Sequence, residues 1–116
     1  MPETGLRGPY SLNTETIDKE VKKNSIGAYA LGYIKKDTGR FVPKYVGRSD
    51  NDLNGRLKDH VDEYPKFKFE YYSSAKAAFE KECTLYHDWK EQLDNKEHPD
   101  RPDSTDWKCP RCDIFE

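Results

Sequence analysis

The stretch from Tyr45 to His60 contains three side chains that could bind or act on an anion such as a phosphate: Tyr45, Arg56 and His60. Its pattern is typical of the end of a buried strand, a glycine turn and the start of a helix. On such a helix Arg56 and His60 would be one turn apart and would therefore share one face. The sequence predicts an anion-binding corner where this strand meets this helix.

A second candidate for chemistry is a carboxylate, Glu82, in the middle of an apolar helix face. Ser73 or Ser74 can cap a predicted helix that runs to about Leu93. The apolar residues within one or two turns of Glu82 are Ala78, Phe79, Leu85, Tyr86 and Trp89. A carboxylate at such a position is costly unless it is paired or bound to a metal ion. Glu82 is therefore expected either to form an ion pair with Arg56 or a lysine, or to bind a metal.

The elements around these residues predict a small α+β domain. Periodicity and turn residues place strands at 26–34, 41–46 and 67–72, and helices at 14–21, 53–61 and about 74–93. The first strand is apolar on both faces, as expected for the centre of a sheet. Pro43 restricts the second strand to a sheet edge or a bulge. We expect a three-stranded antiparallel β-sheet flanked by helices.

The chain divides into a short N-terminal part, one domain and a tail. Residues 1–24 contain a glycine- and proline-rich arm and a short helix capped by Thr14 or Thr16. This part is expected to cover a sheet edge or the mouth of the core. Residues 25–95 carry the candidate site, and residues 96–116 form a polar, proline-broken tail. With 116 residues, of which 34% are hydrophobic and 13% aromatic, the chain has material for one small core.

Basic residues are concentrated in one segment of an otherwise acidic chain. The net charge is −2, whereas the segment from Lys35 to Lys58 carries seven basic and three acidic residues, which gives 7 − 3 = +4. Such a segment predicts contact with nucleic-acid phosphates, with an ordinary solvated hairpin as an equal alternative. The candidate contacts are Lys35, Lys36, Arg40, Lys44, Arg48 and Lys58.

No segment of the sequence predicts membrane insertion or secretion. The longest apolar runs are too short to span a bilayer, and no charged-then-apolar leader is present. The expected location is therefore the cytoplasm.

The tail contains a Cys-x-x-Cys pair, Cys109 and Cys112, which is half of a zinc site. Zinc takes four ligands, usually from cysteine and histidine. The candidates for the other ligands are His98 in the tail and Cys83 or His87, one helical turn apart on the predicted long helix. Such a site would fix the tail to that helix. The alternative is a flexible end with reduced cysteines and no metal.

Five short motifs, taken in order, resemble those of the GIY-YIG nuclease superfamily. They are Gly27-Ala-Tyr29, Tyr45-Val-Gly47, Arg56-Leu-x-x-His60, Ala78-x-x-x-Glu82-x-x-Leu85 and Asn95. The resemblance covers residues 25–95 and rests on the order of the motifs more than on any one of them. One departure is an extra residue between Gly47 and Arg56, which Gly55 is expected to absorb. Members of the family share a small three-stranded antiparallel sheet flanked by helices and cleave nucleic acids.

The resemblance implies a metal-dependent endonuclease that hydrolyses phosphodiester bonds in DNA. Tyr29 and Tyr45 would lie beside the scissile phosphate, where one of them helps to deprotonate a water molecule. Arg56 would stabilise the phosphoryl charge, and His60 would orient a tyrosine or protonate the leaving group. Glu82 would bind one Mg²⁺ or Mn²⁺ ion. The residues with structural roles would be Gly27, Gly47 and Asn95.

Each of these residues also has an ordinary structural interpretation. Tyr29 and Tyr45 could be plain sheet aromatics, and His60 could be a surface histidine paired with Glu63. The alternative function is a non-catalytic module of the same fold that binds nucleic acid or a protein. DNA is the expected partner, and the sequence neither excludes RNA nor fixes the oligomeric state.

Overall fold

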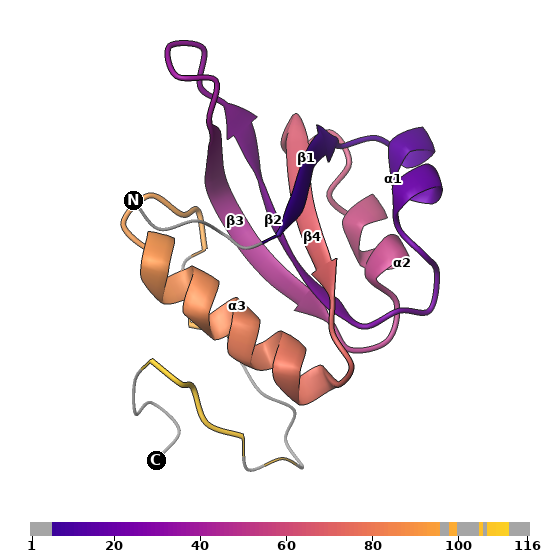
Figure 1. Cartoon of the computed structure of the whole chain (residues 1–116), viewed down its shortest axis with the longest axis vertical. Coiled ribbons are helices and arrows are strands. Elements are labelled where there is room, and N and C mark those ends of the chain that lie inside the picture. Colours follow the sequence, from indigo (N-terminus) through magenta and orange to yellow (C-terminus); the bar gives the residue numbers. More distant parts are fainter. Residues whose placement is uncertain (1–5, 96–97, 100–104, 106, 112–116) are drawn as a thin grey trace.

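The sheet is organised around β2 (Gly27–Ile34), which is buried on both faces over most of its length. The computed structural model describes residues 6–95, 98–99, 105 and 107–111. Within them, four antiparallel strands are arranged in the order β1-β4-β2-β3. β1 (Arg7–Ser11) and β3 (Phe41–Ser49) lie at the edges, and β4 (Lys66–Tyr71) lies between β1 and β2. The loop that joins β2 to β3 extends well beyond the sheet (Figure 1).

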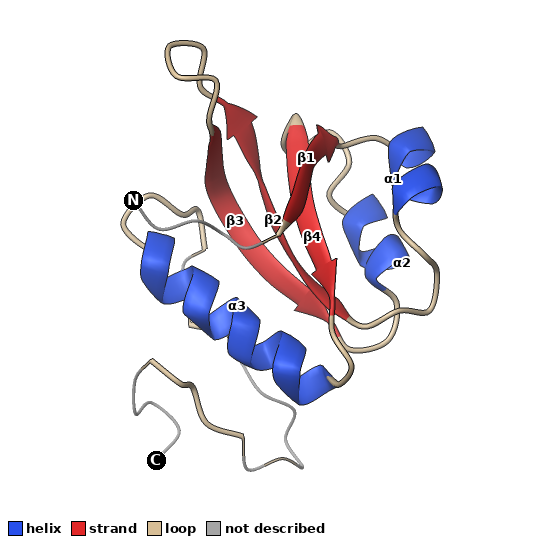
Figure 2. Ribbon diagram, in the orientation of Figure 1, coloured by secondary structure: helices blue, strands red, loops and turns tan. Residues whose placement is uncertain are grey.

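Helices cover both faces of this sheet. α1 (Thr14–Glu20) and α2 (Leu53–Lys58) lie on one side, and α3 (Ala75–Trp89) lies on the other (Figure 1; Figure 2). Ser74 caps α3, as predicted, because its side chain accepts a hydrogen bond from the amide of Ala77. None of the helices in the described part of the chain is long and apolar enough to cross a membrane.

Each face of the sheet has its own core. On one face Tyr29 packs in a cluster with Leu53 and Leu57 of α2. On the other, Ala30 packs with Leu85 of α3. Because successive strand residues point to opposite faces, β2 and β3 can place functional side chains both on the face that α2 covers and on the face that α3 covers.

The N-terminal segment forms a strand that the sequence did not predict, so the sheet has four strands and not three. Tyr10 of β1 lies opposite Phe67 of β4, and its ring packs on Phe67 and Phe69 at centroid distances of 5.6 and 5.8 Å. Gly8 and Pro9 are unfavourable in strands, so the residue pattern of this segment does not predict β1. The expectation that this arm covers a sheet edge is confirmed, because β1 covers the edge of β4.

The helix that carries Arg56 is shorter than predicted. α2 ends at Lys58 and not at residue 61. The amides of Asp59, His60 and Val61 bond to carbonyls three residues back, a 3₁₀-type pattern that tightens the chain after the helix. His60 therefore lies in a turn, not on the helix face of Arg56.

The remaining boundaries differ in smaller ways. α1 is capped by Asn13, whose side-chain oxygen accepts from the amide of Thr16, and not by Thr14 or Thr16. α3 ends at Trp89 and not near residue 93. β3 continues past residue 46. It is an edge strand and the sheet register is irregular beside Pro43, so the prediction of a sheet edge or a bulge at Pro43 is confirmed.

Candidate active site and candidate metal centre

Tyr29 is the buried centre of the candidate active site. It is 2% exposed and lies directly opposite Gly47 of β3 in the sheet register. A β-carbon at position 47 would lie 2.4 Å from the Tyr29 hydroxyl oxygen and 2.5 Å from the ring carbon that bears it. The glycine therefore makes room for the phenol to cross over the edge strand.

Replacing Gly47 with alanine should displace Tyr29 and destabilise the fold by about 1–3 kcal/mol, because a rigid ring occupies the space of the new methyl group. Denaturant unfolding of the variant and of the parent protein measures the difference. The matched control is the same substitution in a Tyr29→Ala background, where the methyl group meets no ring. An equal cost in both backgrounds would contradict this explanation.

His60 connects Tyr29 to a carboxylate. Its Nε2 lies 3.1 Å from the Tyr29 hydroxyl, and its Nδ1 lies 2.9 Å from Oε1 of Glu63. Because a carboxylate only accepts, Nδ1 carries the hydrogen, and Nε2 of the neutral ring is left to accept from the Tyr29 hydroxyl. His60 therefore pairs with Glu63 and contacts Tyr29 at the same time.

Tyr45 of β3 borders the same histidine. The centroid of its ring lies 5.1 Å from that of His60, compared with 5.7 Å for Tyr29. Tyr45 is two residues from Gly47 along β3, so both phenols lie on the same face of the sheet. Tyr45 is partly exposed, whereas Tyr29 is buried.

Glu82 of α3 forms an ion pair with Arg48 of β3, and not with Arg56 or a lysine. Nη1 of Arg48 lies 2.7 Å from Oε1 of Glu82. Glu82 is only 9% exposed. The guanidinium also bonds Asp50 through Nε at 2.9 Å and lies over the ring of Phe79. Burial raises the pKa of Glu82 to about 7, although Arg48 acts to lower it. Oε2 of Glu82 makes no hydrogen bond in the described part of the chain.

Arg48 is the site residue whose position the sequence analysis missed. It was grouped with the cations expected to contact nucleic acid, yet its side chain is only 13% exposed and is bonded to two carboxylates. A usable signal was present in the sequence. Gly47 faces Tyr29, so its neighbour Arg48 must point to the opposite face, which α3 covers with Glu82.

Arg56 of α2 is exposed, and within the described residues its side chain makes neither an ion pair nor a hydrogen bond. Its charge nevertheless acts on the site. Burial raises the pKa of both Tyr29 and Tyr45, the charge of Glu82 adds to that rise, and Arg56 opposes it. That Arg56 is turned toward the phenols, despite the extra residue between Gly47 and Arg56, stays a prediction.

Two of the predicted structural residues make close backbone contacts. The side chain of Asn95 bonds both the amide and the carbonyl of Val46, each at 2.9 Å, and so holds the segment after α3 against β3. A β-carbon at Gly27 would lie 2.5 Å from the carbonyl oxygen of Glu70 and 2.6 Å from the side chain of Leu53. Glycine at position 27 therefore lets α2 approach the sheet.

The predicted nucleic-acid contacts fall into two groups. Lys35, Lys36 and Arg40 are exposed in the loop between β2 and β3. Lys44 lies 3.9 Å from Asp94, and Lys58 lies 2.6 Å from Asp18, measured from Nζ to Oδ1 in each case. The loop is therefore the most accessible part of the basic segment.

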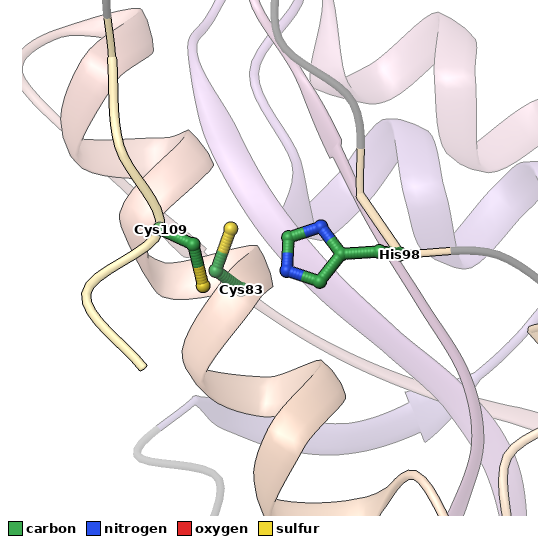
Figure 3. A group of neighbouring side chains, drawn as sticks. All are labelled: Cys83, His98 and Cys109. Atoms are coloured by element: carbon green, nitrogen blue, oxygen red, sulfur yellow. The ribbon is translucent and has the colours of Figure 1, made fainter. Parts of the chain in front are cut away.

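Three of the predicted zinc ligands come together beside α3. Cys83, His98 and Cys109 each offer one ligand atom, and these atoms all lie within 4.8 Å of one another, so the group could hold a metal ion (Figure 3). Burial raises the pKa of the Cys83 thiol, and a hydrogen bond with Cys109 adds to the effect. His87 is outside the group, although its ring centroid lies 5.2 Å from that of His98. Cys112 lies outside the described residues.

Compared with known proteins, the chain matches no protein-family model, no curated protein and no solved structure. Its function therefore has to be argued from its own residues.

Proposed function

We propose that the chain is a metal-dependent endonuclease of the GIY-YIG type that hydrolyses phosphodiester bonds in DNA. The observation that supports this proposal is the contact of two phenols with one imidazole on one face of the edge strand β3. The phenols are those of Tyr29 and Tyr45, and the imidazole is that of His60. Arg56 would add a guanidinium from α2, and Glu82 would add a carboxylate from α3, which covers the other face of the sheet.

Proton transfer would run through Tyr29 and His60. A buried phenol with a raised pKa is a poor base by itself. His60 Nε2 is placed to accept the phenol proton as the phenol takes one from the attacking water. Glu63 would hold the imidazole in the required tautomer through Nδ1 and stabilise the imidazolium that forms.

Arg56 and Tyr45 would act on the phosphate itself. Arg56 has a guanidinium that no described residue engages, and this planar fork suits two oxygens of a phosphoryl group. Its charge would stabilise the negative charge that develops in the transition state. Tyr45, partly exposed beside His60, would form one wall of the phosphate site.

Glu82 fits a single hard divalent cation. Mg²⁺ commonly takes one or two carboxylates and keeps several water ligands, and Glu82 offers one carboxylate with Oε2 uncommitted among the described residues. Arg48 would fix the carboxylate through Oε1. A bound Mg²⁺ or Mn²⁺ ion would supply Lewis-acid stabilisation of the phosphate and the leaving oxygen.

A plasmid-nicking assay tests the proposal. Supercoiled plasmid incubated with the full chain and Mg²⁺ should be converted to the open-circular form, EDTA should stop the conversion, and added Mg²⁺ should restore it. Arg56→Ala and Glu82→Gln should lose the activity while keeping the circular dichroism spectrum of the parent protein. Activity that persists in both folded variants would overturn the proposal.

A non-catalytic nucleic-acid-binding module is the second candidate, and the exposed basic loop favours it. Lys35, Lys36 and Arg40 are exposed in the loop between β2 and β3, and this loop extends beyond the sheet (Figure 1). Binding without cleavage at every metal concentration, unaffected by Glu82→Gln, would support this function over the first. Both candidates place DNA against the same loop, and RNA remains open as a partner for either.

Removing two charges from the loop should weaken DNA binding. Lys35→Ala combined with Lys36→Ala should lower the affinity several-fold and reduce the slope of log K against log salt by about two, since about one counterion is released per phosphate contact. Fluorescence anisotropy over a salt series, without added divalent metal, measures both quantities. The matched control is Lys22→Ala with Lys23→Ala, the same charge change at the other end of β2. Equal effects of the two double variants would argue against loop contact.

A zinc ion held by Cys83, His98 and Cys109 would have a structural role and take no part in cleavage. The cytoplasm stays the predicted location.

A further inference from the structure

We propose that Cys83, His98 and Cys109 bind a structural zinc ion that fixes the C-terminal tail on α3. The three residues come from α3 and from two separate points of the segment that follows it. Cys83 directly follows Glu82 on α3, and Phe79 packs against both Arg48 and the two cysteines, so this group is a neighbour of the candidate active site. A structural role for the zinc ion does not require nuclease activity.

The ligand atoms are already close to the spacing that zinc demands. With Zn–S distances of about 2.3 Å and Zn–N distances of about 2.0 Å, the ligand atoms of a tetrahedral site are about 3.5–3.8 Å apart. In this structure they lie within 4.8 Å of one another. Each pair would have to approach by little more than about 1 Å, which side-chain rotation can supply.

His98 has the hydrogen-bond arrangement of a metal ligand. Its Nδ1 lies 2.7 Å from the carbonyl oxygen of Pro99, and a carbonyl can only accept, so Nδ1 carries the hydrogen. The other nitrogen, Nε2, then has a lone pair, and it lies on the side of the ring that faces Cys83 and Cys109 (Figure 3). A bond from the second ring nitrogen to a carbonyl is the usual way in which proteins orient a metal-bound histidine.

The surroundings of the group suit a closed structural site. Cys83 is fully buried and Cys109 is 6% exposed. Both belong to a cluster with Phe79, and the ring of Trp107 packs on Phe79 at a centroid distance of 5.7 Å. This apolar shell limits water access. Two buried cysteines could pack as small apolar residues without a metal, but that gives no reason for an imidazole nitrogen to face both sulfur atoms.

The donor set selects zinc among the common metals. Thiolate and imidazole ligands suit zinc, whereas Mg²⁺ and Ca²⁺ require oxygen. Structural zinc takes four ligands, of which Cys83, His98 and Cys109 would supply three. A zinc ion would add metal bonds to the packing of Trp107 and Cys109 on Phe79.

Metal analysis of the full chain tests the proposal. The protein is purified under reducing conditions from zinc-supplemented cultures, and its metals are measured by plasma mass spectrometry. We expect about one zinc ion per chain, and a loss of at least about fivefold in Cys83→Ala, His98→Ala and Cys109→Ala. The matched control is His87→Gln, one turn along α3 from Cys83 and beside His98, which should keep its zinc.

Two measurements on the parent protein keep the test decisive if a variant does not fold. Chelation should lower the melting temperature, and zinc alone should restore it. Cobalt substituted for zinc should give the thiolate charge-transfer bands of a tetrahedral site. Zinc below about 0.2 per chain with an unchanged melting temperature after chelation would overturn the proposal. So would iron in place of zinc, or loss of zinc in His87→Gln. None of these measurements uses nuclease activity. The zinc proposal can therefore be refuted while the nuclease proposal holds, and the nuclease proposal can be refuted while the zinc proposal holds.

Discussion

Replacing Glu82 with glutamine should reduce Mg²⁺-dependent plasmid nicking by at least about 100-fold, because a metal ion contributes several kcal/mol of charge stabilisation and each 1.4 kcal/mol is a factor of about ten in rate. Glutamine has the shape of glutamate, and its side-chain oxygen can still accept from Arg48. The fold should therefore persist while the charge that holds the cation is lost. Initial rates of nicking over a range of Mg²⁺ concentrations measure the effect.

The control for this variant lies on the same helix. Glu80→Gln makes the same change of charge two residues away, on a side chain that is not buried, and should leave the nicking rate within about twofold, as expected for a surface substitution. A Glu82→Gln protein that is folded and nicks at a rate close to that of the parent would contradict the metal role of Glu82. Equal losses in the two variants would show that net charge, and not a metal ligand, sets the rate.

Arg56 gives an independent measure of the same site. Its side chain has no ion pair or hydrogen bond among the described residues, so Arg56→Ala should cost little stability. The rate should still fall by about 100- to 1000-fold if the guanidinium stabilises the transition state. Arg56→Lys should recover only part of the loss, because an ammonium group lacks the planar fork. Full recovery would mean that charge alone is required.

The sequence predicted much of the frame of the site because local patterns determine it. The apolar run of β2 and the alternation of Phe67 and Phe69 both reflect which face of the sheet is buried. The structure has the three predicted strands within a few residues of the predicted bounds. The buried position of Glu82 followed from helical periodicity for the same reason.

Other features depend on contacts between residues far apart in the chain. β1 is a strand only because β4, some sixty residues later, presents Phe67 and Phe69 to Tyr10. Its own glycine and proline give no strand signal. The early end of α2 has a similar cause. The ring nitrogens of His60 contact Tyr29 and Glu63, and the spacing of apolar residues along a helix does not predict these contacts.

The metal group shows the same limit. Residue types and the Cys-x-x-Cys spacing named five candidate ligands, but spacing could not separate Cys83 from His87, one turn apart on α3. Both side chains are near the tail. The path of the chain after α3 places a ring nitrogen of His98 near the sulfur of Cys83 and leaves His87 outside the group. The sequence does not predict that path.

Replacing Arg48 with methionine should lower the free energy of unfolding by about 2–4 kcal/mol at pH 8, because it leaves Glu82 as a buried charge without its partner. Methionine replaces the apolar stem of arginine as far as about the position of Nε, so the packing of the stem is largely kept. The loss therefore reports the missing charge more than a missing volume. Urea unfolding without added divalent metal measures it.

The size of this loss should depend on pH in a defined direction. The pKa of Glu82 is already raised from its ordinary value of 4.5 to about 7 by burial, and removing Arg48 should raise it further. A group whose pKa is higher in the folded than in the unfolded state contributes stability below its unfolded pKa and loses it as the pH rises through the folded value. The deficit of Arg48→Met should therefore be smaller at pH 5, where Glu82 can take up a proton, and larger at pH 8.

Two controls separate this explanation from simple loss of packing. In Arg48→Met combined with Glu82→Gln no buried charge remains, so the deficit should shrink and lose its dependence on pH. Arg7→Met breaks an ion pair with Glu70 whose arginine is 56% exposed, and an exposed pair should cost no more than about 1 kcal/mol. A deficit for Arg48→Met that is the same at pH 5 and pH 8 would mean that the guanidinium stabilises β3 and α3 through its contact with Phe79 and not through the charge of Glu82. The carboxylate would then be free to bind a cation without losing a partner, and Arg48 would have no part in setting its charge.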